Sequence, residues 1–242
     1  MVLGEFTGPL DAELWGSDIL AALGGLKGNA ANEIVPAAEA TGTAEALAIL
    51  RVFAAVGWPE LRSAATQAAD RLTEQGQDAR GLDARGLDAQ GRDARGLDEP
   101  PWTALMGAPT VGECWRYGDD RGLQEAVTMS FSYEAERHVV SLLLDHGFGG
   151  AIKDVWVGAA GDVLARTRAM ADQDPKMVFE MISPSDAHAR AVRAIAAGEC
   201  PTQPDEIGNI ASTRAILRAR VALLPVTAEP KDEHTAEPTG ER

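Results

Sequence analysis

Asp145, His146, Lys153 and Asp154 are the residues whose types and spacing best suit chemistry in this chain. Glycines separate the first pair from the second, and a glycine lets a ligand approach backbone amides closely. The Lys153 ammonium group would balance a negative charge that develops during a reaction. The group therefore suits a hydrolase-like enzyme in which Asp145, His146 and Lys153 act together.

A structural interpretation fits the same residues. Gly147, Gly149 and Gly150 are what a tight connection between two strands requires, because such turns use positive φ. Asp145 and His146 are adjacent, and neighbours on one strand point to opposite faces of a sheet. The segment is therefore predicted to be a well-capped turn or a site for a ligand or protein partner, with catalysis as a third interpretation.

A metal site can be drawn from histidine and carboxylate residues, since this combination suits zinc, manganese or iron. The candidates are Glu136, His138, Asp145, His146 and the Asp119–Asp120 pair. His138 and His146 would lie roughly 25 Å apart along an extended strand, so one ion cannot bind both. No metal is therefore predicted.

Other catalytic signatures are absent from the sequence. Ser141 has no GxSxG elbow around it, and neither Cys114 nor Cys200 has a basic partner nearby in sequence. The GFGGAIKD segment has neither the GxxxxGK[ST] nor the GxGxxG spacing, and it links strand to strand where those motifs open a helix. No cofactor is predicted, and the two thiols are expected to be reduced.

Charge and hydropathy restrict the possible partners. The chain has 242 residues, 45% of them hydrophobic, and a formal net charge of −15. Direct binding to nucleic acid or to an anionic membrane requires clustered Lys and Arg, which this balance disfavours. No apolar run approaches the roughly 18 residues that span a bilayer, and residues 1–8 lack the pattern of a signal peptide. A cytoplasmic protein is predicted.

One segment reverses the charge. Residues 184–225 contain 5 arginines and 4 acidic residues, whereas residues 1–75 contain 10 acidic and 4 basic residues. The arginines are Arg190, Arg193, Arg214, Arg218 and Arg220. Either they are attracted to the acidic remainder of the chain, or they bind an anionic ligand.

Helical spacing dominates residues 1–75, where apolar residues recur every three to four positions. The boundary signals are Pro9 for a first helix, a Thr43 N-cap and a Gly57 stop for a second, and Pro59 and Gly76 for the ends of a third. Prolines suit the first turn of a helix, and glycines suit its end. Only Gly57 and Trp58 separate the second and third helices, so these should form an antiparallel hairpin.

Residues 76–100 are near-copies of a five-residue unit, GQDAR-GLDAR-GLDAQ-GRDAR-GLDEP. A β-solenoid would need bulky apolar residues at inward positions over several turns. Here leucine occurs at most once per unit and charges of both signs alternate, so little surface can be buried against the entropy of ordering. A flexible or partly helical linker is predicted.

Residues 101–225 change period. The predicted strands are Glu113–Tyr117, Glu125–Tyr133, Val139–Asp145, Ala151–Val157 and Lys176–Ile182. Val139–Asp145 is apolar at nearly every position, which is typical of a strand covered on both faces. Ser183, Pro184 and Asp186 form a helix start signal, and a final helix is predicted over Asp205–Leu224.

The predicted fold class is α+β. A helical subdomain (residues 1–75) and the linker (76–100) precede an α+β domain (101–225) with a mainly antiparallel sheet covered by helices. An acidic tail, residues 226–242, is predicted to be disordered.

The segment Cys114–Asp119, followed by FSYEAERHVVSLLLDHGFGGAIKD, resembles an uncharacterised family of proteins from high-GC bacterial genomes. In that family a helical N-terminal half precedes a similar core that carries Gly-Asp, Asp-His and Lys-Asp elements. The resemblance covers mainly residues 101–225 and implies no particular activity. It implies that Asp119, Asp145, His146, Lys153 and Asp154 matter for binding or folding.

The sequence thus favours a cytoplasmic, non-enzymatic interaction or regulatory module. Its protein or small-molecule partner would be recognised around residues 145–154 and the helical hairpin. A hydrolase using Asp145, His146 and Lys153 is the alternative, and an acidic nucleic-acid mimic that occupies a basic partner is a third interpretation.

Overall fold

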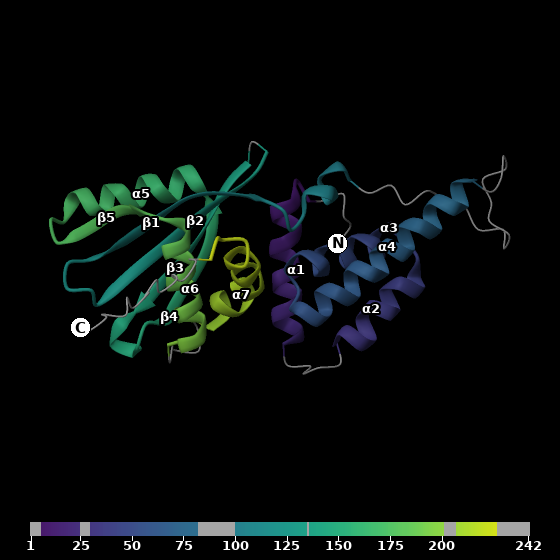
Figure 1. Ribbon diagram of the computed structural model, residues 1–242, viewed down its shortest axis with the longest axis horizontal. Coiled ribbons are helices and arrows are strands. Elements are labelled where there is room, and N and C mark those ends of the chain that lie inside the picture. The colour runs from purple at the N-terminus through teal and green to yellow at the C-terminus, as the bar shows by residue number, and fades with distance from the viewer. Residues whose placement is uncertain (1–5, 25–29, 82–99, 135, 201–206, 227–242) are drawn as a thin grey trace, which may run out of the picture.

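The computed structural model describes residues 6–24, 30–81, 100–134, 136–200 and 207–226. Within these ranges it contains seven α-helices and one five-stranded antiparallel sheet, so the predicted α+β class is confirmed. Figure 1 shows a bundle of N-terminal helices beside the sheet, with α1 (Pro9–Leu23) and α7 (Ile207–Val221) between the two parts. Among the described helices, none combines the length and apolar character needed to cross a bilayer.

The helical bundle is α1 together with α2 (Ala30–Thr41), α3 (Ala44–Val56) and α4 (Pro59–Gly81). The Thr43 hydroxyl accepts a hydrogen bond from the Ala46 amide, which confirms the predicted N-cap of α3. The predicted stop at Gly76 is wrong, since α4 continues to Gly81. Good helix formers follow Gly76, and one glycine costs a helix only about 1 kcal/mol. The remaining repeats, residues 82–99, lie outside the described residues.

Helix α2 has no counterpart among the predicted helices. Pro36 lies inside it, and a proline at that position normally indicates a helix end. Helix α1 packs closely on α3 at Gly16, where a Cβ atom would lie only 2.0 Å from a methyl group of Val52. The sequence therefore predicts three of the helices that form the bundle core, α1, α3 and α4, and misses α2.

The sheet has the strand order β4-β3-β2-β1-β5. Its strands are β1 (Thr110–Asp119), β2 (Gln124–Tyr133), β3 (Glu136–Asp145), β4 (Ala151–Ala159) and β5 (Met177–Ile182). Two 3-10 helices accompany the sheet: η2 (Pro101–Leu105) precedes β1, and η3 (His146–Phe148) links β3 to β4. The helices α5 (Ala160–Gln173) and α6 (Pro184–Ala197) flank β5 in the sequence. All five predicted strands are confirmed, with β1 longer at both ends than expected.

Both faces of the sheet are covered, as predicted for residues 139–145. Val140 and Leu142 belong to a core that includes residues of α6 and α7. The opposite face carries Val139 and a buried hydroxyl pair, Thr128 and Ser141, whose oxygens lie 2.8 Å apart. Helix α5 covers part of this face (Figure 1).

Helix α7 is apolar on two sides, because it lies between the sheet and the bundle. Ile210, Leu217 and Leu224, seven residues apart, pack into the core of the sheet. Ala219 belongs to the bundle core, and Ile216 packs with Leu10 of α1. One helix therefore closes two cores.

A buried ion pair joins α1 to α7. Glu13 and Arg220 have no exposed surface, and Arg220 Nη2 donates a hydrogen bond to Glu13 Oε2. The other oxygen of Glu13 accepts hydrogen bonds from the Tyr133 hydroxyl and, at 2.7 Å, from the Gly107 amide. Gly107 has φ +76°, which side-chain-bearing residues rarely adopt. Segments far apart in the sequence therefore converge on one carboxylate.

His138 of β3 completes this network. Its Nε2 accepts a hydrogen bond of 3.2 Å from Arg220 Nε, and its ring stacks against Phe131 and Tyr133. Burial, and secondarily the charge of Arg220, lower the pKa of His138 to about 3. The imidazole is therefore neutral in the folded protein, with its proton on Nδ1.

Replacing one member of the ion pair should destabilise the protein strongly. Glu13→Leu or Arg220→Met alone should lower the free energy of unfolding by about 3–5 kcal/mol, because each leaves a buried charge unpaired. The double variant should cost clearly less than the two single costs added together. Urea unfolding of all four proteins measures this, with Arg71→Met, which breaks the exposed Arg71–Glu39 pair, as a control of little effect. Additive losses would contradict the proposed pairing.

The neutral His138 should make the protein sensitive to acid. In the unfolded state His138 is protonated below about pH 6.5, whereas in the folded state its pKa is about 3. The free energy of unfolding therefore falls as the pH falls between these values. From pH 6.5 to 4.5 the wild-type protein should lose about 2 kcal/mol more than His138→Gln, which keeps an acceptor for Arg220 but does not titrate. Urea unfolding at several pH values measures the difference. Equal losses in both proteins would exclude the neutral buried imidazole.

Candidate functional site

Asp119 closes the turn between β1 and β2. Its carboxylate accepts hydrogen bonds from the backbone amides of Arg121, Leu123 and Gln124, at 2.8–3.2 Å. These hydrogen bonds lower the pKa of Asp119 below its ordinary value, and the bond from the Leu123 amide has the largest effect. The side chain acts as an acceptor for turn amides.

Asp145 plays the same part at the end of β3. One carboxylate oxygen accepts from the Gly147 amide at 2.9 Å and so caps η3, while the other accepts from the Gln124 side chain at 2.9 Å. Gly149 ends η3 with φ +71°. The arrangement is that of the predicted well-capped turn.

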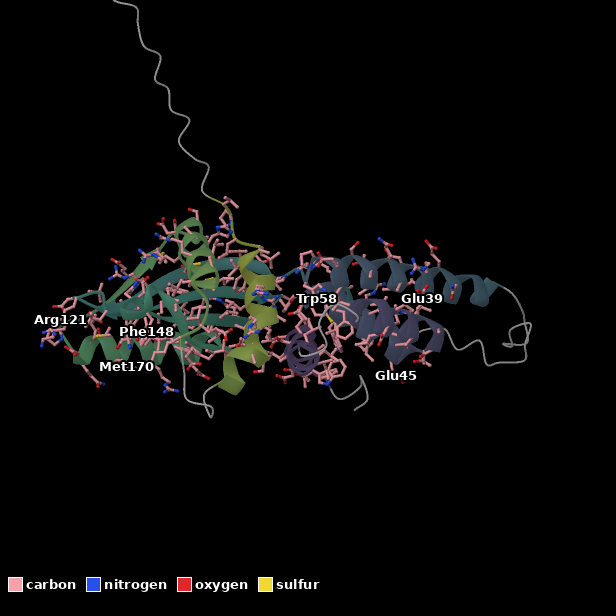
Figure 2. The ribbon with its side chains drawn as sticks, turned by 90° about the horizontal axis from the view of Figure 1, so that it is seen from below. Glu39, Glu45, Trp58, Arg121, Phe148 and Met170 are labelled. Carbon is pink, nitrogen blue, oxygen red and sulfur yellow. The ribbon has the colours of Figure 1, made fainter. Side chains whose placement is uncertain are left out.

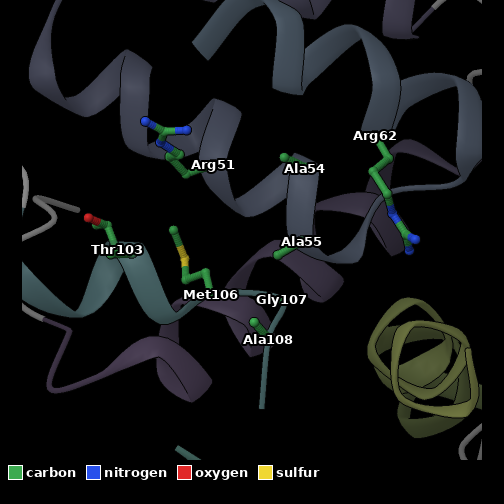
Figure 3. Close-up of a pocket in the computed structure, with 9 residues that line it drawn as sticks. Arg51, Ala54, Ala55, Arg62, Thr103, Met106, Gly107 and Ala108 are labelled. Atoms are coloured by element: carbon green, nitrogen blue, oxygen red, sulfur yellow. The ribbon is translucent and has the colours of Figure 1, made fainter. Parts of the chain in front are cut away.

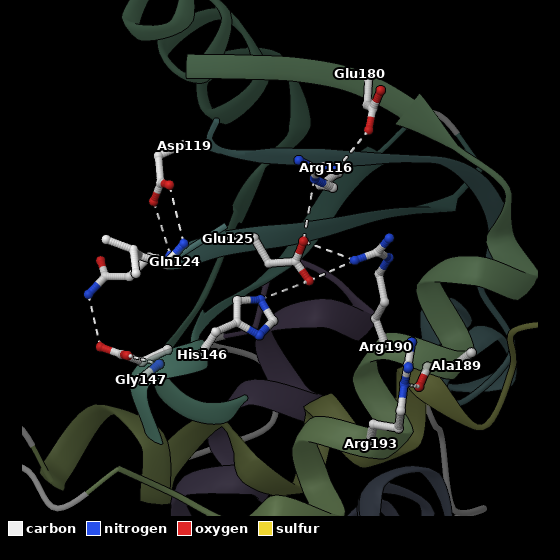
Figure 4. Close-up of polar contacts among 12 residues, drawn as sticks. Arg116, Asp119, Gln124, Glu125, His146, Gly147, Glu180, Ala189, Arg190 and Arg193 are labelled. Atoms are coloured by element: carbon white, nitrogen blue, oxygen red, sulfur yellow. Dashed lines mark hydrogen bonds and ion pairs between the residues drawn. The ribbon is translucent and has the colours of Figure 1, made fainter. Parts of the chain in front are cut away.

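His146 points away from this turn toward Glu125 of β2, as Figure 4 shows. Its Nε2 lies 3.5 Å from a carboxylate oxygen of Glu125, which is almost fully buried. Arg190 of α6 binds both oxygens of Glu125 at 2.8 and 2.9 Å, and Arg116 Nε lies 3.4 Å away. Asp145 and His146 therefore have different partners, and the Glu125 carboxylate is already held by cations.

Lys153 and Asp154 lie on β4, beside a bulge. Asp154 pairs across the sheet with Leu143, whereas Asp145 pairs with Ala151. The Lys153 side chain is exposed, and one oxygen of Asp154 accepts from the Val155 amide at 2.8 Å. The predicted residues thus divide among two turns, an ion cluster and a strand, rather than converging on one pocket.

The cysteines and the candidate metal ligands have structural surroundings. Burial raises the pKa of Cys114 to about 11 and also raises that of Cys200. Thiols with raised pKa values are poor nucleophiles at neutral pH. In the described ranges, no group of three His, Cys, Asp or Glu side chains could hold a metal ion, and His138 is enclosed in the Arg220 network.

A larger concave feature lies where the bundle meets α7. We call it the junction pocket, a cavity of about 560 Å³. It is lined by the end of α1, the α3–α4 turn and α7: Leu20, Ala21, Leu23, Gly24, Val56, Gly57, Trp58, Pro59, Arg62, Ala211, Arg214, Ala215, Arg218 and Ala222. Figure 2 places Trp58 at this junction, while Phe148, from the turn after β3, lies at the outer end of the α+β part.

One stripe of α7, together with Ala222 just after the helix, faces the junction pocket. Ala211, Arg214, Ala215, Arg218 and Ala222 recur at helical spacing and all line the cavity. The alanines leave space, whereas the arginines place positive charge at its wall. A smaller cavity of about 210 Å³ adjoins this wall, since Arg214 and Arg218 line it as well.

A second cavity has a volume of about 530 Å³. Its lining includes Arg51, Met106 and Gly107 (Figure 3). Figure 3 shows the Arg62 side chain extending from α4 toward α7. Arg62 therefore lines both this cavity and the junction pocket.

Comparison of the chain with protein-family models, with curated proteins and with solved structures found no match. The resemblance to proteins of high-GC bacterial genomes stays a prediction. The candidate sites therefore depend on geometry and chemistry alone.

The sequence predictions missed both the junction pocket and the Arg220 network. The excess of arginine in residues 184–225 was a signal for both sites. Four of the five arginines in this segment lie in one of these sites or in an ion pair. Arg190 pairs with Glu125, Arg220 pairs with Glu13, and Arg214 and Arg218 line the junction pocket. Arg214 also pairs with Glu199. Attraction to acidic residues thus explains Arg190, Arg214 and Arg220, whereas the anionic-ligand interpretation fits Arg218 at the junction pocket.

Substitutions in the Glu125 cluster should separate a structural role from a chemical one. Arg190→Ala should lower the free energy of unfolding by about 1.5–3 kcal/mol, because a buried carboxylate loses a two-pronged charged partner. His146→Ala should cost less than about 1 kcal/mol, because that side chain is 40% exposed and its contact is long. Urea unfolding measures both. A greater loss for His146→Ala than for Arg190→Ala would contradict this ranking.

Proposed function

We propose that the chain is a non-enzymatic binding module of the cytoplasm, whose small ligand or partner-protein segment occupies the junction pocket. The observation that carries the proposal is the cavity itself. Its volume of about 560 Å³ falls in the range of roughly 300–1,000 Å³ that is typical of ligand pockets. Its lining is mostly apolar with a few polar groups, and such pockets favour interfaces between structural parts.

A regulatory role follows from the position of the pocket. Its walls belong to the bundle (Val56, Trp58) and to α7 (Ala211, Ala215), which also packs on the sheet. A ligand that contacts both walls binds the protein better when the bundle is packed against α7 than when the two are apart. Binding therefore stabilises the packed state by mass action. Occupancy would therefore be transmitted to the packing between the two parts of the protein.

The hydrolase alternative has less support. Its three residues would have to converge on one substrate, yet Asp145 caps a turn and His146 faces Glu125. A general base must lie within hydrogen-bonding reach of the proton that it removes. Within residues 145–154, Ile152 lines the smaller cavity of about 210 Å³, so the larger junction pocket is the preferred binding site.

A neutral dye that fluoresces in apolar surroundings, Nile red, tests the proposal. The wild-type chain should bind one dye molecule saturably. Ala211→Phe should weaken binding about tenfold, because the ring fills space at the pocket wall. Fluorescence titration measures the affinity, and thermal unfolding checks that the variant folds.

Ala189→Phe is the matched control. Ala189 is half-buried on α6, like Ala211 on α7, but does not line the junction pocket. Its dye affinity should equal that of the wild type. Absence of saturable binding, or equal weakening in both variants, would contradict the proposed function.

A further inference from the structure

The charge of the junction pocket is opposite to that of the chain. The formal net charge of the protein is −15, yet the residues known to line this pocket include three arginines and no aspartate or glutamate. Clustered charge of one sign in a cleft concentrates ligands of the opposite sign. The pocket therefore suits an anion.

Two of the three arginines have donors to spare. Arg214 is held by Glu199, with its Nη2 at 2.6 Å from a carboxylate oxygen. Arg62 donates from Nη2 to the Gly57 carbonyl at 3.3 Å, but its Nε is buried and has no hydrogen-bond partner among the described residues. Arg218 is exposed and makes no ion pair within the described part of the chain. Among the residues that the structure describes, Arg116, His138 and Arg220 each have a buried nitrogen without a hydrogen-bond partner as well, but of these four residues only Arg62 lines the junction pocket. An anion that enters the pocket would supply the acceptor that Arg62 lacks.

The rest of the lining is apolar. Leu23 and Trp58 are half-buried, Leu20 and Val56 are almost fully buried, and the alanines of α7 leave room at the wall. A purely hydrophilic anion, such as phosphate, would leave the half-buried Leu23 and Trp58 in contact with water. An anion with an alkyl body satisfies the arginines and covers the apolar lining together.

We propose that the junction pocket binds a small amphipathic carboxylate, such as a medium-chain fatty acid. Its carboxylate group contacts Arg62 and Arg218, and its alkyl chain lies over Leu23, Trp58 and Ala215. Guanidinium groups match carboxylates in geometry, and the contact with two of them is strongest where water is excluded. The inference rests on the proposed binding function and names the chemistry of the ligand.

A head-group series tests the inference on the full-length chain. Dodecanoate, dodecan-1-ol and dodecyltrimethylammonium, below their micelle concentrations, compete with Nile red for the pocket. Dodecanoate should bind at least about tenfold more tightly than the alcohol or the cation, as expected for one charged hydrogen bond. Acetate should compete far more weakly than dodecanoate, because it has no alkyl chain to bury.

Arginine variants locate the preference. Arg218→Gln and Arg62→Gln should each reduce the preference for dodecanoate over dodecan-1-ol several-fold, and Arg218→Lys should keep part of it because the charge remains. Arg193→Gln is the matched control: it removes the same charge from an exposed arginine whose Nε donates only within α6. It should leave the preference unchanged.

The outcomes separate the inference from the function on which it rests. Displacement of Nile red with equal affinity by all three head groups would overturn the carboxylate assignment and leave the binding function intact. A preference that survives both pocket variants, or that Arg193→Gln removes equally, would also overturn it. Failure of Nile red itself to bind would overturn the proposed function.

Discussion

Transfer of two charges from water into a protein costs several kcal/mol per ion, so the pairing of Glu13 with Arg220 depends on the hydrogen bonds that surround it. Here the Tyr133 hydroxyl, the Gly107 amide and His138 supply hydrogen bonds to the pair. These groups come from the segment before β1, from β2 and from β3. The ion pair therefore forms only when the bundle and the sheet are docked, which makes it a constraint on their relative position.

The junction pocket depends on this constraint. Arg220 and two of the three arginines of the pocket, Arg214 and Arg218, lie on one helix, so fixing Arg220 sets the rotation of α7 about its axis. With that rotation Ile210 and Leu217 face the sheet, and the stripe from Ala211 to Ala222 faces the α3–α4 turn. A pocket between two parts of a protein keeps its shape only if the parts do not slide. The buried network and the proposed ligand site are thus coupled through one helix.

Much of the fold is predictable from local patterns, whereas the sites are not. Thr43, Pro59 and Ser183 act at helix ends as their residue types indicate, and the apolar run at residues 139–145 is indeed covered on both faces. Glu13 and Arg220 show no local sign of pairing, because they are separated by nearly the whole chain. The same holds for Trp58 and Arg218 at the pocket. Asp145 and His146 look catalytic in sequence, but the tertiary packing directs them to different partners.

Differential scanning calorimetry of the full-length protein tests most directly whether the bundle and the sheet form one unit through the buried ion pair. If they do, heating should give a single transition whose calorimetric and van't Hoff enthalpies have a ratio of about 1. Two resolved transitions, or a ratio well above that value, would show that the two parts unfold independently and would contradict the account.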